Sequence, residues 1–344
     1  MNITVVGCGA LGSYYGACLQ RAGHTVTFLL RSDFEAVRAQ GVRIRSLNGD
    51  FTVHPRCVRS PEEAGIAELV LIGLKTTAND QFPRLLPPLV GPHTAVLTLQ
   101  NGLGNEEALA ALFPADQILG GLCFVCLNRI APGVIQHTAH GRILLGEFAG
   151  PAAARTNAIA SAFHTAGVPC EVTDNLAEAH WQKLVWNIAF NGLGVASAAG
   201  HAPWISAGPT PISAQGICLT TDRLLADADW TARASALMGE VIAAAEAKGH
   251  RMPRAYAALQ ISRTREMGAY RPSTLIDFEQ GLPLELESLF LEPLRQARAA
   301  GVPTPHLESL CVILSRLAGV QSRGRGSVVW RPVPGGPHPR RKGT

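Results

Sequence analysis

The chain lacks any apolar stretch long enough to cross a membrane. Its longest apolar runs are interrupted by Asn, Lys or Glu before they reach the roughly 18–20 residues that a spanning helix needs. It also lacks a basic and apolar leader ahead of the first strand-like run, which begins at Ile3, so we expect a cytoplasmic protein rather than a secreted one. Charged residues are scarce as well, at 16% of 344 residues against 47% hydrophobic residues. This composition excludes a largely disordered chain and is typical of a globular α/β enzyme with room for two domains.

A strong net charge is also missing from most of the chain. The formal charge is +4, but residues 321–344 hold six basic residues and no acidic one, so the rest of the chain carries −2. We therefore expect no binding to nucleic acid. The tail itself is rich in proline and glycine, and we expect it to be disordered.

Cysteine is present, but not in a metal-binding pattern. Most of the eight cysteines lie in apolar segments, as expected for reduced, packed thiols in a cytoplasmic protein. Cys123 and Cys126 have the spacing of a redox or zinc pair, yet neither a second pair nor a nearby histidine pair accompanies them. We therefore predict no metal site.

The first thirty residues contain a glycine-rich turn between two strand-like runs. An apolar run at Ile3–Val6 leads into the sequence GCGALG at 7–12, then into a helical segment and a second run at Thr25–Leu30. In this context Gly7 permits the tight turn, Gly9 lets the backbone approach a pyrophosphate, and Gly12 lets the helix pack on the sheet. The helix offers its first N–H groups and the positive end of its dipole to phosphates. We therefore expect the turn to bind a dinucleotide through Gly7, Gly9, Ala10, Leu11 and Gly12.

The residue at the end of the second strand indicates which dinucleotide binds. NAD-binding units normally carry an acidic residue there, which accepts a hydrogen bond from the ribose 2′-hydroxyl. This chain has Arg31 and Ser32 instead, and a guanidinium pairs well with a 2′-phosphate. NADP(H) is the favoured cofactor, although Asp33 leaves NAD open and Arg31 can also be read as a solvated strand-end charge.

Further strand-like runs follow the alternation of a parallel, doubly wound sheet. Runs at 69–74, 95–99 and 119–127 are separated from one another by helical or turn-rich segments. We expect a small hairpin within 41–59, turning at Asn48-Gly49, and a second one within 134–145, with Gly141 between its halves.

Beyond about Glu171, helical patterns replace the strands, at 175–199, 220–248, 254–268, 284–299 and 305–318. The predicted fold class is α/β, with an N-terminal Rossmann-type doubly wound sheet and a C-terminal all-helical domain. We assign 1–172 to an NADP-binding Rossmann domain, 173–320 to a helical substrate and dimerisation domain, and 321–344 to the basic tail. Substrate is expected in the crevice between the domains, near the carboxyl ends of the strands.

One of the predicted helices carries a polar stripe on an otherwise apolar surface. Lys183, Asn187 and Asn191 recur every four residues, while almost all other positions between 184 and 190 are apolar. Buried polar groups of this kind need partners, which a substrate, a cofactor edge or a structural network would supply. The pattern alone leaves these readings open.

An ordered set of motifs resembles the ketopantoate reductase family, the NADPH-dependent 2-dehydropantoate 2-reductases of pantothenate synthesis. The resemblance covers roughly residues 1–318 and includes GCGALG at 7–12, Leu74-Lys75, LQNG at 99–102, the Lys183, Asn187 and Asn191 stripe, and Ser273-Thr-Leu-x-Asp277 with Glu285. It implies a cleft between a Rossmann domain and a helical domain. It also implies Lys183 as the general acid and Glu285 as a group near the reacting oxygen.

The same resemblance implies that the substrate is bound by Lys75, Asn101, Asn187, Asn191 and Ser273, with Lys75 and Asn101 also near the cofactor. Four of the residues that the resemblance implies also have a plainer reading. Lys75 fits a strand-end charge, Asn101 a tight turn, Ser273 a helix N-cap and Glu285 an exposed helix position. The residue chemistry suits the implied roles, because a lysine ammonium stabilises negative charge that develops on a keto oxygen and then donates a proton. Burial is expected to lower the pKa of Lys183, and a nearby Glu285 to hold it charged and aimed.

Two positions depart from the family pattern. His201 stands where many of these reductases place another substrate-contacting Asn, and residues 76–79 lack a Gln that is common near that turn. Both changes concern substrate contacts, so the reaction type is firmer than the substrate. We expect an oxidoreductase that reduces 2-dehydropantoate with NADPH, with a homodimer as its possible assembly. The alternatives are a reductase of another small branched 2-keto acid and a non-catalytic NADP(H) sensor.

Overall fold

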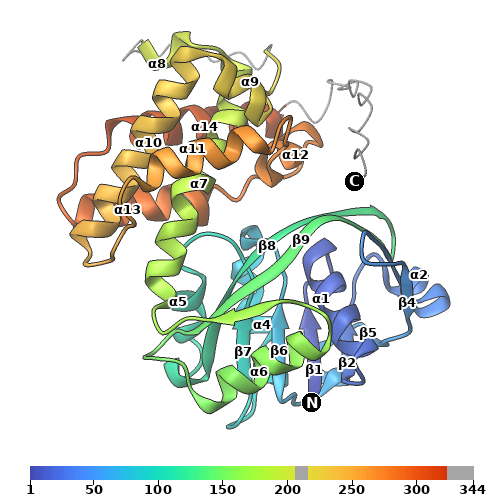
Figure 1. Ribbon diagram of the computed structural model, residues 1–344. Coiled ribbons are helices and arrows are strands. Elements are labelled where there is room, and N and C mark those ends of the chain that lie inside the picture. Colours follow the sequence, from blue (N-terminus) through green and yellow to red (C-terminus); the bar gives the residue numbers. More distant parts are fainter. Residues whose placement is uncertain (206–215, 324–344) are drawn as a thin grey trace, which may run out of the picture.

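The structure is a computed structural model that describes residues 1–205 and 216–323. It consists of a sheet-containing N-terminal part and a helical C-terminal part, which lie one above the other in Figure 1. The strands form one ten-stranded sheet with the order β4-β3-β9-β8-β7-β6-β1-β2-β5, and β10 pairs with β9. Their bounds are β1 Asn2–Val6, β2 Thr25–Leu29, β3 Val42–Ser46, β4 Phe51–Val53, β5 Arg56–Val58, β6 Leu69–Ile72, β7 Ala95–Thr98, β8 Ile118–Ala131, β9 Val134–Glu147 and β10 Cys170–Val172. The predicted fold class is confirmed.

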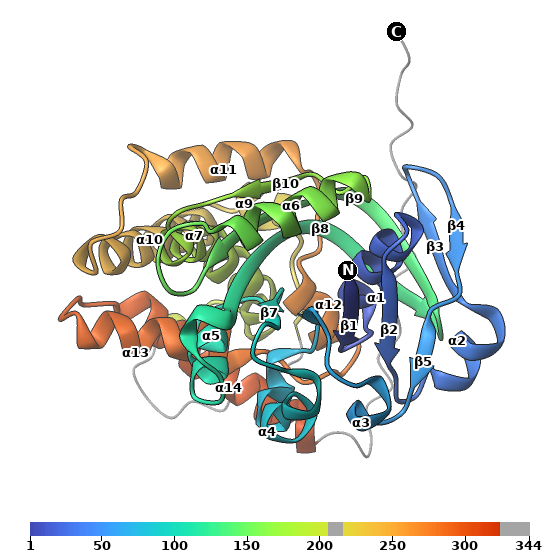
Figure 2. The same ribbon diagram turned by 90° about the horizontal axis from the view of Figure 1, so that it is seen from below.

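Successive side chains along the central strands point to opposite faces of the sheet, and both faces are buried. Val5 of β1 belongs to the core under α1 and α6, whereas the next residue, Val6, belongs to the core on the opposite face. Figure 2 shows α1 and α6 on one side of the strands and α3 and α4 on the other. The helices of this part are α1 Ala10–Arg21, α2 Phe34–Gln40, α3 Pro61–Ala64, α4 Phe82–Leu85, α5 Asn105–Ala110 and α6 Ala154–Thr165, with the short helices η1 Thr76–Gln81, η2 Pro87–Leu89 and η3 Ala115–Gln117. Runs that are apolar at every position are therefore strands covered by helices on both sides.

The first predicted hairpin is confirmed and the second is wrong. β3 and β4 pair antiparallel across the turn that contains Gly49, where φ is +100°. Within 134–145, however, the chain forms one continuous strand, β9, that pairs antiparallel with β8. Gly141 lies inside β9 with φ of +131°, near a register irregularity between Phe124 and Val125. β8 offers a partner along the whole segment, so the glycine marks an irregularity in a long strand rather than a turn.

The C-terminal part is built around the long helix α7, Leu176–Ala196. Its beginning lies against β8 and β9, and its later turns form the core of the helical part together with α10, α12 and α14. The other helices are α8 Ala202–Ile205, α9 Thr221–Ala226, α10 Ala228–Ala247, α11 Tyr256–Glu266, α12 Ser273–Glu279, α13 Glu292–Ala299 and α14 Pro305–Arg323, with η4 Ser197–Ala199 and the π-helix η5 Glu287–Leu291. In the ranges that are described, no helix combines the length and apolar character needed to cross a bilayer.

Two helical boundaries differ from those predicted. The segment 220–248 is divided because Asp227 has an extended backbone, and its carboxylate accepts hydrogen bonds from the N–H groups of Asp229 and Trp230 at the start of α10. α14 continues to Arg323, so the first three residues of the expected tail extend this helix. Residues 324–344, which carry the rest of the tail prediction, lie outside the described residues.

Parallel pairing brings the loops after three central strands to one edge of the sheet. β1 pairs in parallel with β6, and β6 with β7, so Gly7, Lys75 and Asn101 all follow the carboxyl ends of neighbouring strands. The helical part lies over this edge in Figure 1. Ligands of doubly wound sheets bind in this kind of location.

Candidate active site

A cleft of about 3000 Å³ separates the carboxyl edge of the sheet from the helical part. Pockets for single small ligands usually measure about 300–1000 Å³, so this cleft has room for a dinucleotide and a substrate together. With the exception of Gly12, which lies behind the turn, every predicted site residue lines it: Gly7, Gly9, Ala10, Leu11, Arg31, Lys75, Asn101, Lys183, Asn187, Asn191, Ser273 and Glu285.

The glycine turn at one end of the cleft fits a bound pyrophosphate. Gly7 has φ of +94°, and a Cβ built on it would lie 2.3 Å from the backbone nitrogen of Leu74. A Cβ on Gly12 would lie 2.3 Å from the Gly7 carbonyl oxygen, so both positions require glycine for the fold itself. A Cβ on Gly9 would meet no atom within 4 Å, and Gly9 is the N-cap of α1. This open face, directly in front of the first N–H groups of a helix, suits an anionic group of a dinucleotide.

The segment that follows β2 presents an exposed cation and a buried carboxylate that is hydrogen-bonded to the protein. Arg31 is exposed and lines the cleft. The Asp33 side chain is only 7% exposed, and it accepts hydrogen bonds from Arg129 Nη1 at 2.6 Å and from the Gly133 N–H at 3.1 Å. Asp33, which kept NAD open in the sequence, is thus committed to protein partners.

Lys183 extends from α7 into the cleft. There it contacts the loop that follows β7 and the middle of strand β8. Its Nζ donates to Asn101 Oδ1 at 2.8 Å and to the Cys123 carbonyl oxygen at 2.9 Å, and it lies 5.4 Å from the centre of the Phe124 ring. Burial lowers the pKa of Lys183 below its ordinary value, and the negative charge of Glu285 opposes that shift only in part. An amine in this environment releases its proton more readily than an exposed lysine.

Glu285, which we expected to hold Lys183 charged and aimed, makes its hydrogen bonds to other residues. Glu285 Oε1 accepts from the Thr76 N–H at 2.8 Å, and its Oε2 lies 3.5 Å from Lys75 Nζ. Lys75 also donates to Asp277 Oδ2 at 2.6 Å. Partial burial works to lower the pKa of Lys75, but the carboxylates of Glu285 and Asp277 raise it above its ordinary value. Glu285 therefore acts on Lys183 only through space, because its direct partners are on the loop after β6.

The amides of the predicted stripe lie along one wall of the cleft. Asn187 is 8% exposed and Asn191 is 4% exposed. Asn191 Oδ1 accepts from the Thr274 N–H at 3.1 Å and from Ser273 Oγ at 3.5 Å, so it holds the first turn of α12 against α7. Ser273 is the first residue of α12 and Pro272 is the N-cap, so the plainer reading of Ser273 as an N-cap is wrong. Its hydroxyl and the two amides line the same cleft as Lys183.

A chain of side-chain amides behind Asn101 was not found from the sequence. Gln100 Nε2 donates to Asn79 Oδ1 at 2.8 Å, Asn79 Nδ2 donates to Asn105 Oδ1 at 2.9 Å, and Asn105 Nδ2 donates to the Asn101 carbonyl oxygen at 3.1 Å. These bonds join the loop after β6 to the loop after β7 and so fix the backbone that carries Asn101. Isolated amides in loops give no sequence signal, because turns contain them for other reasons.

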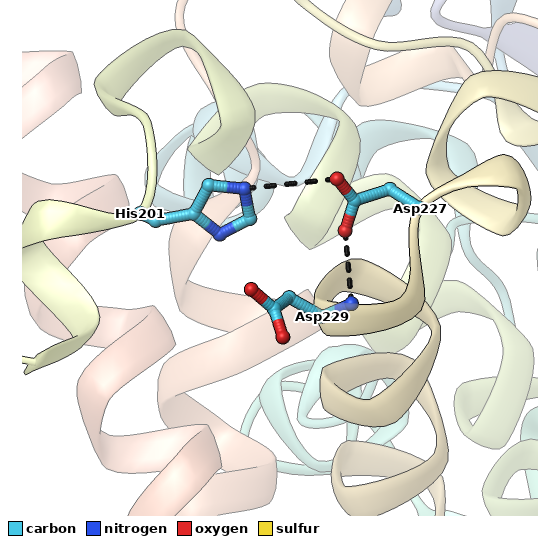
Figure 3. Close-up of side chains that lie close together, drawn as sticks. All are labelled: His201, Asp227 and Asp229. Carbon is cyan, nitrogen blue, oxygen red and sulfur yellow. Dashed lines mark hydrogen bonds and ion pairs between the residues drawn. The ribbon is translucent and has the colours of Figure 1, made fainter.

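His201 does not occupy the substrate position that the sequence comparison with the family pattern implies. Its ring stacks on Trp230 with centroids 4.4 Å apart, Nδ1 lies 2.7 Å from Arg233 Nη1, and it is absent from the cleft lining. Figure 3 shows His201 facing Asp227 and Asp229, with Asp227 bonded to the backbone of Asp229. Asp227 is engaged as the N-cap of α10, so this cluster belongs to the start of that helix.

Comparisons with known proteins agree with the geometry. Residues 3–150 match the family described as ketopantoate reductase PanE/ApbA, and residues 210–318 match its C-terminal family. A 2-dehydropantoate 2-reductase of Nostoc sp. is 38% identical over 331 residues, which cover 94% of this chain and 97% of that protein. A crystal structure of a 2-dehydropantoate 2-reductase from Geobacter metallireducens has a TM-score of 0.84 and 43% identity, covering 92% of this chain and 99% of that one. Another, from Methylococcus capsulatus, has a TM-score of 0.82 and 37% identity over 94% of this chain and 98% of that one.

Both halves of the chain match the family, and two relatives named for the same reaction align over nearly its whole length. The glycine turn, the lysine of α7 and the cleft between two parts occur together in one structure. The chain therefore belongs to the ketopantoate reductase family.

Proposed function

We propose that the chain is an NADPH-dependent oxidoreductase that reduces 2-dehydropantoate to pantoate in pantothenate biosynthesis. The observation that carries this proposal is the position of Lys183 Nζ, held between Asn101 and the carbonyl of Cys123 in the cleft that begins at the glycine turn. The names of two relatives that align over nearly the whole chain support the same reaction.

The residues of the cleft account for the steps that the protein must perform. NADPH supplies the hydride that adds to the keto carbon. Lys183 stabilises the negative charge that develops on the keto oxygen and then donates the proton that completes the hydroxyl group. Asn101 keeps the ammonium aimed into the cleft, since its Oδ1 accepts one of the three N–H bonds.

We assign recognition of the substrate carboxylate and hydroxyl groups to the polar groups around Lys183. Asn187, Asn191 and Ser273 bring amide and hydroxyl groups to the same wall, and Lys75 adds a positive charge. Two carboxylates, Asp277 and Glu285, hold Lys75 in place, and Glu285 keeps negative charge near the reacting group. These roles require the side chains of Asn187, Asn191, Ser273 and Lys75 to face one ligand.

The cofactor assignment rests on both ends of the dinucleotide site. The open position at Gly9 and the start of α1 suit the pyrophosphate, and the exposed guanidinium of Arg31 suits a 2′-phosphate. We infer that residues 1–172 bind NADP(H) and that residues 173–320 complete the substrate site.

A panel of 2-keto acids tests the reaction, with consumption of NADPH followed by absorbance. We expect 2-dehydropantoate to give the highest kcat/KM. A higher value for another branched 2-keto acid would favour the alternative reductase. NADP+ binding without turnover of any compound would favour a non-catalytic sensor, against which Lys183 and its two acceptors argue.

We further place the protein in the cytoplasm as a homodimer. All eight cysteines are free thiols, which is usual in a reducing compartment. Light scattering coupled to gel filtration tests the dimer, and a mass equal to one chain at micromolar concentration would contradict it.

A further inference from the structure

The predicted 2′-phosphate site contains an acidic group as well as Arg31. Asp33 lies two residues beyond Arg31 and lines the same cleft. Burial works to raise the pKa of Asp33, but hydrogen bonds from Gly133 and Arg129 outweigh it and hold the pKa below its ordinary value. The carboxylate is therefore fully charged at neutral pH. A fixed negative charge beside this strand end opposes binding of a phosphate and favours a ribose hydroxyl.

A second arginine, from a distant part of the chain, forms an ion pair with Asp33. Arg129 lies near the tip of the β8–β9 hairpin, and its Nη1 is 2.6 Å from Asp33 Oδ1. Its side chain stays 46% exposed and lines the cleft. Of the other groups at this end, Arg59 is paired with Glu35, and Glu62 adds one further exposed carboxylate. Without Arg129, the Asp33 carboxylate would be an uncompensated negative charge two positions along the chain from Arg31.

We propose that Arg129 is a specificity-determining residue, which makes the cleft selective for NADP(H) over NAD(H) by cancelling the charge of Asp33. This inference rests on the proposed use of NADP(H). Arg129 acts through its ion pair with Asp33 and is not proposed to contact the reacting atoms. It is therefore a positioning residue and not a catalytic one. A purely structural role also has support, since Asp33 accepts from the backbone of Gly133 and thereby pins the hairpin tip. The two roles differ in what they do to the choice of cofactor.

Calorimetric binding of NADP+ and NAD+ separates them without requiring turnover. We expect Arg129→Met to reduce the preference for NADP+ over NAD+ roughly tenfold, with little change in NAD+ affinity. The ratio of the two affinities is measured on one protein preparation, so a fraction of unfolded protein does not alter it. Adding Asp33→Asn to Arg129→Met is expected to restore the preference to within about threefold of wild type, because the opposing charge is gone while an oxygen remains for Gly133.

Arg155→Met is the matched control. Arg155 pairs with Glu147, whose side chain is 4% exposed, and neither residue lines the cleft. This variant loses the partner of a buried carboxylate, as Arg129→Met does, and is expected to keep the wild-type cofactor ratio.

Equal losses for NADP+ and NAD+ in Arg129→Met, or a double variant that stays unselective, would overturn the inference. A wild-type protein that binds NAD+ as tightly as NADP+ would overturn it together with the cofactor assignment. A wild-type protein that selects NADP+ but does not reduce 2-dehydropantoate would overturn the proposed reaction alone.

Discussion

Replacing Lys183 by methionine removes the proposed proton donor while keeping most of the volume of its side chain. Two of the three ammonium N–H bonds are used by Asn101 Oδ1 and the Cys123 carbonyl oxygen, at 2.8 and 2.9 Å, which leaves one for a substrate oxygen. Loss of a positioned general acid typically costs 10²–10⁴ in rate, or about 3–5 kcal/mol of transition-state stabilisation. We therefore expect kcat of Lys183→Met to fall by roughly 10²–10⁴, with NADP+ affinity close to wild type.

The assay is steady-state reduction of 2-dehydropantoate, with NADP+ binding measured separately by calorimetry. Lys248→Met is the matched control, because Lys248 is an exposed lysine at the end of α10 that does not line the cleft. It should retain full activity. A kcat of Lys183→Met within threefold of wild type would refute the general-acid role, whatever its effect on stability.

The pH dependence provides a second readout of the same group. Burial lowers the pKa of Lys183, and a general acid is active only while protonated. The rate should therefore be constant at lower pH and fall on the alkaline side, at a pH below the value of about 10.4 of an exposed lysine. Lys183→Met should lack this alkaline limb. A limb that persists unchanged in the variant would assign the titration to another group.

Three further predictions concern the glycine turn, the cation after β2 and a buried pair that joins α5 to α7. Gly9→Ala should unfold like wild type but bind NADP+ at least tenfold more weakly, whereas Gly12→Ala should be destabilised by about 1–3 kcal/mol because its Cβ would lie 2.3 Å from a backbone oxygen; a Gly9→Ala protein with normal affinity would contradict the pyrophosphate position. Arg31→Ala should weaken NADPH far more than NADH in kinetic assays, and equal losses would exclude the phosphate contact. Glu106→Ala should lower the free energy of unfolding by about 1–3 kcal/mol, because it leaves buried His180 without the carboxylate 3.0 Å away; a change below about 0.5 kcal/mol in urea unfolding would show that the pair contributes little.

Features with a local cause could be predicted from the sequence. The turn at 7–12 follows from the steric need for glycine, which Gly7 and Gly12 confirm by the contacts that a Cβ would make. The polar stripe of α7 follows from helical periodicity, since spacing of four residues places side chains on one face. Continuous apolar runs predicted central strands, because both faces of each strand are buried.

Features that depend on distant partners could not be predicted. Lys75 and Asp277 are 202 positions apart, and Asp33 and Arg129 are 96 positions apart, so no spacing rule connects them. The sequence around Gly141 predicts a turn. It does not reveal that β8 pairs with the whole of β9, because that pairing is a tertiary property. The expected substrate position of His201 could not be checked from the sequence for the same reason. Its ring packs on Trp230 and does not line the cleft.

Lys75 and Lys183 both line the cleft but have opposite environments. This difference suits them to different roles. Lys75 lies beside two carboxylates that raise its pKa, so it keeps its proton across the physiological range and suits donation of a hydrogen bond to the substrate. Lys183 has neutral hydrogen-bond acceptors and a buried position that lowers its pKa, so it suits release of a proton. Titratable groups whose environments drive their pKa values apart commonly divide electrostatic and acid–base roles in this way. Exchanging the roles would require Glu285 to bond Lys183 instead of Thr76 and Lys75, and the observed pairing therefore supports our proposal that Lys183 is the proton donor.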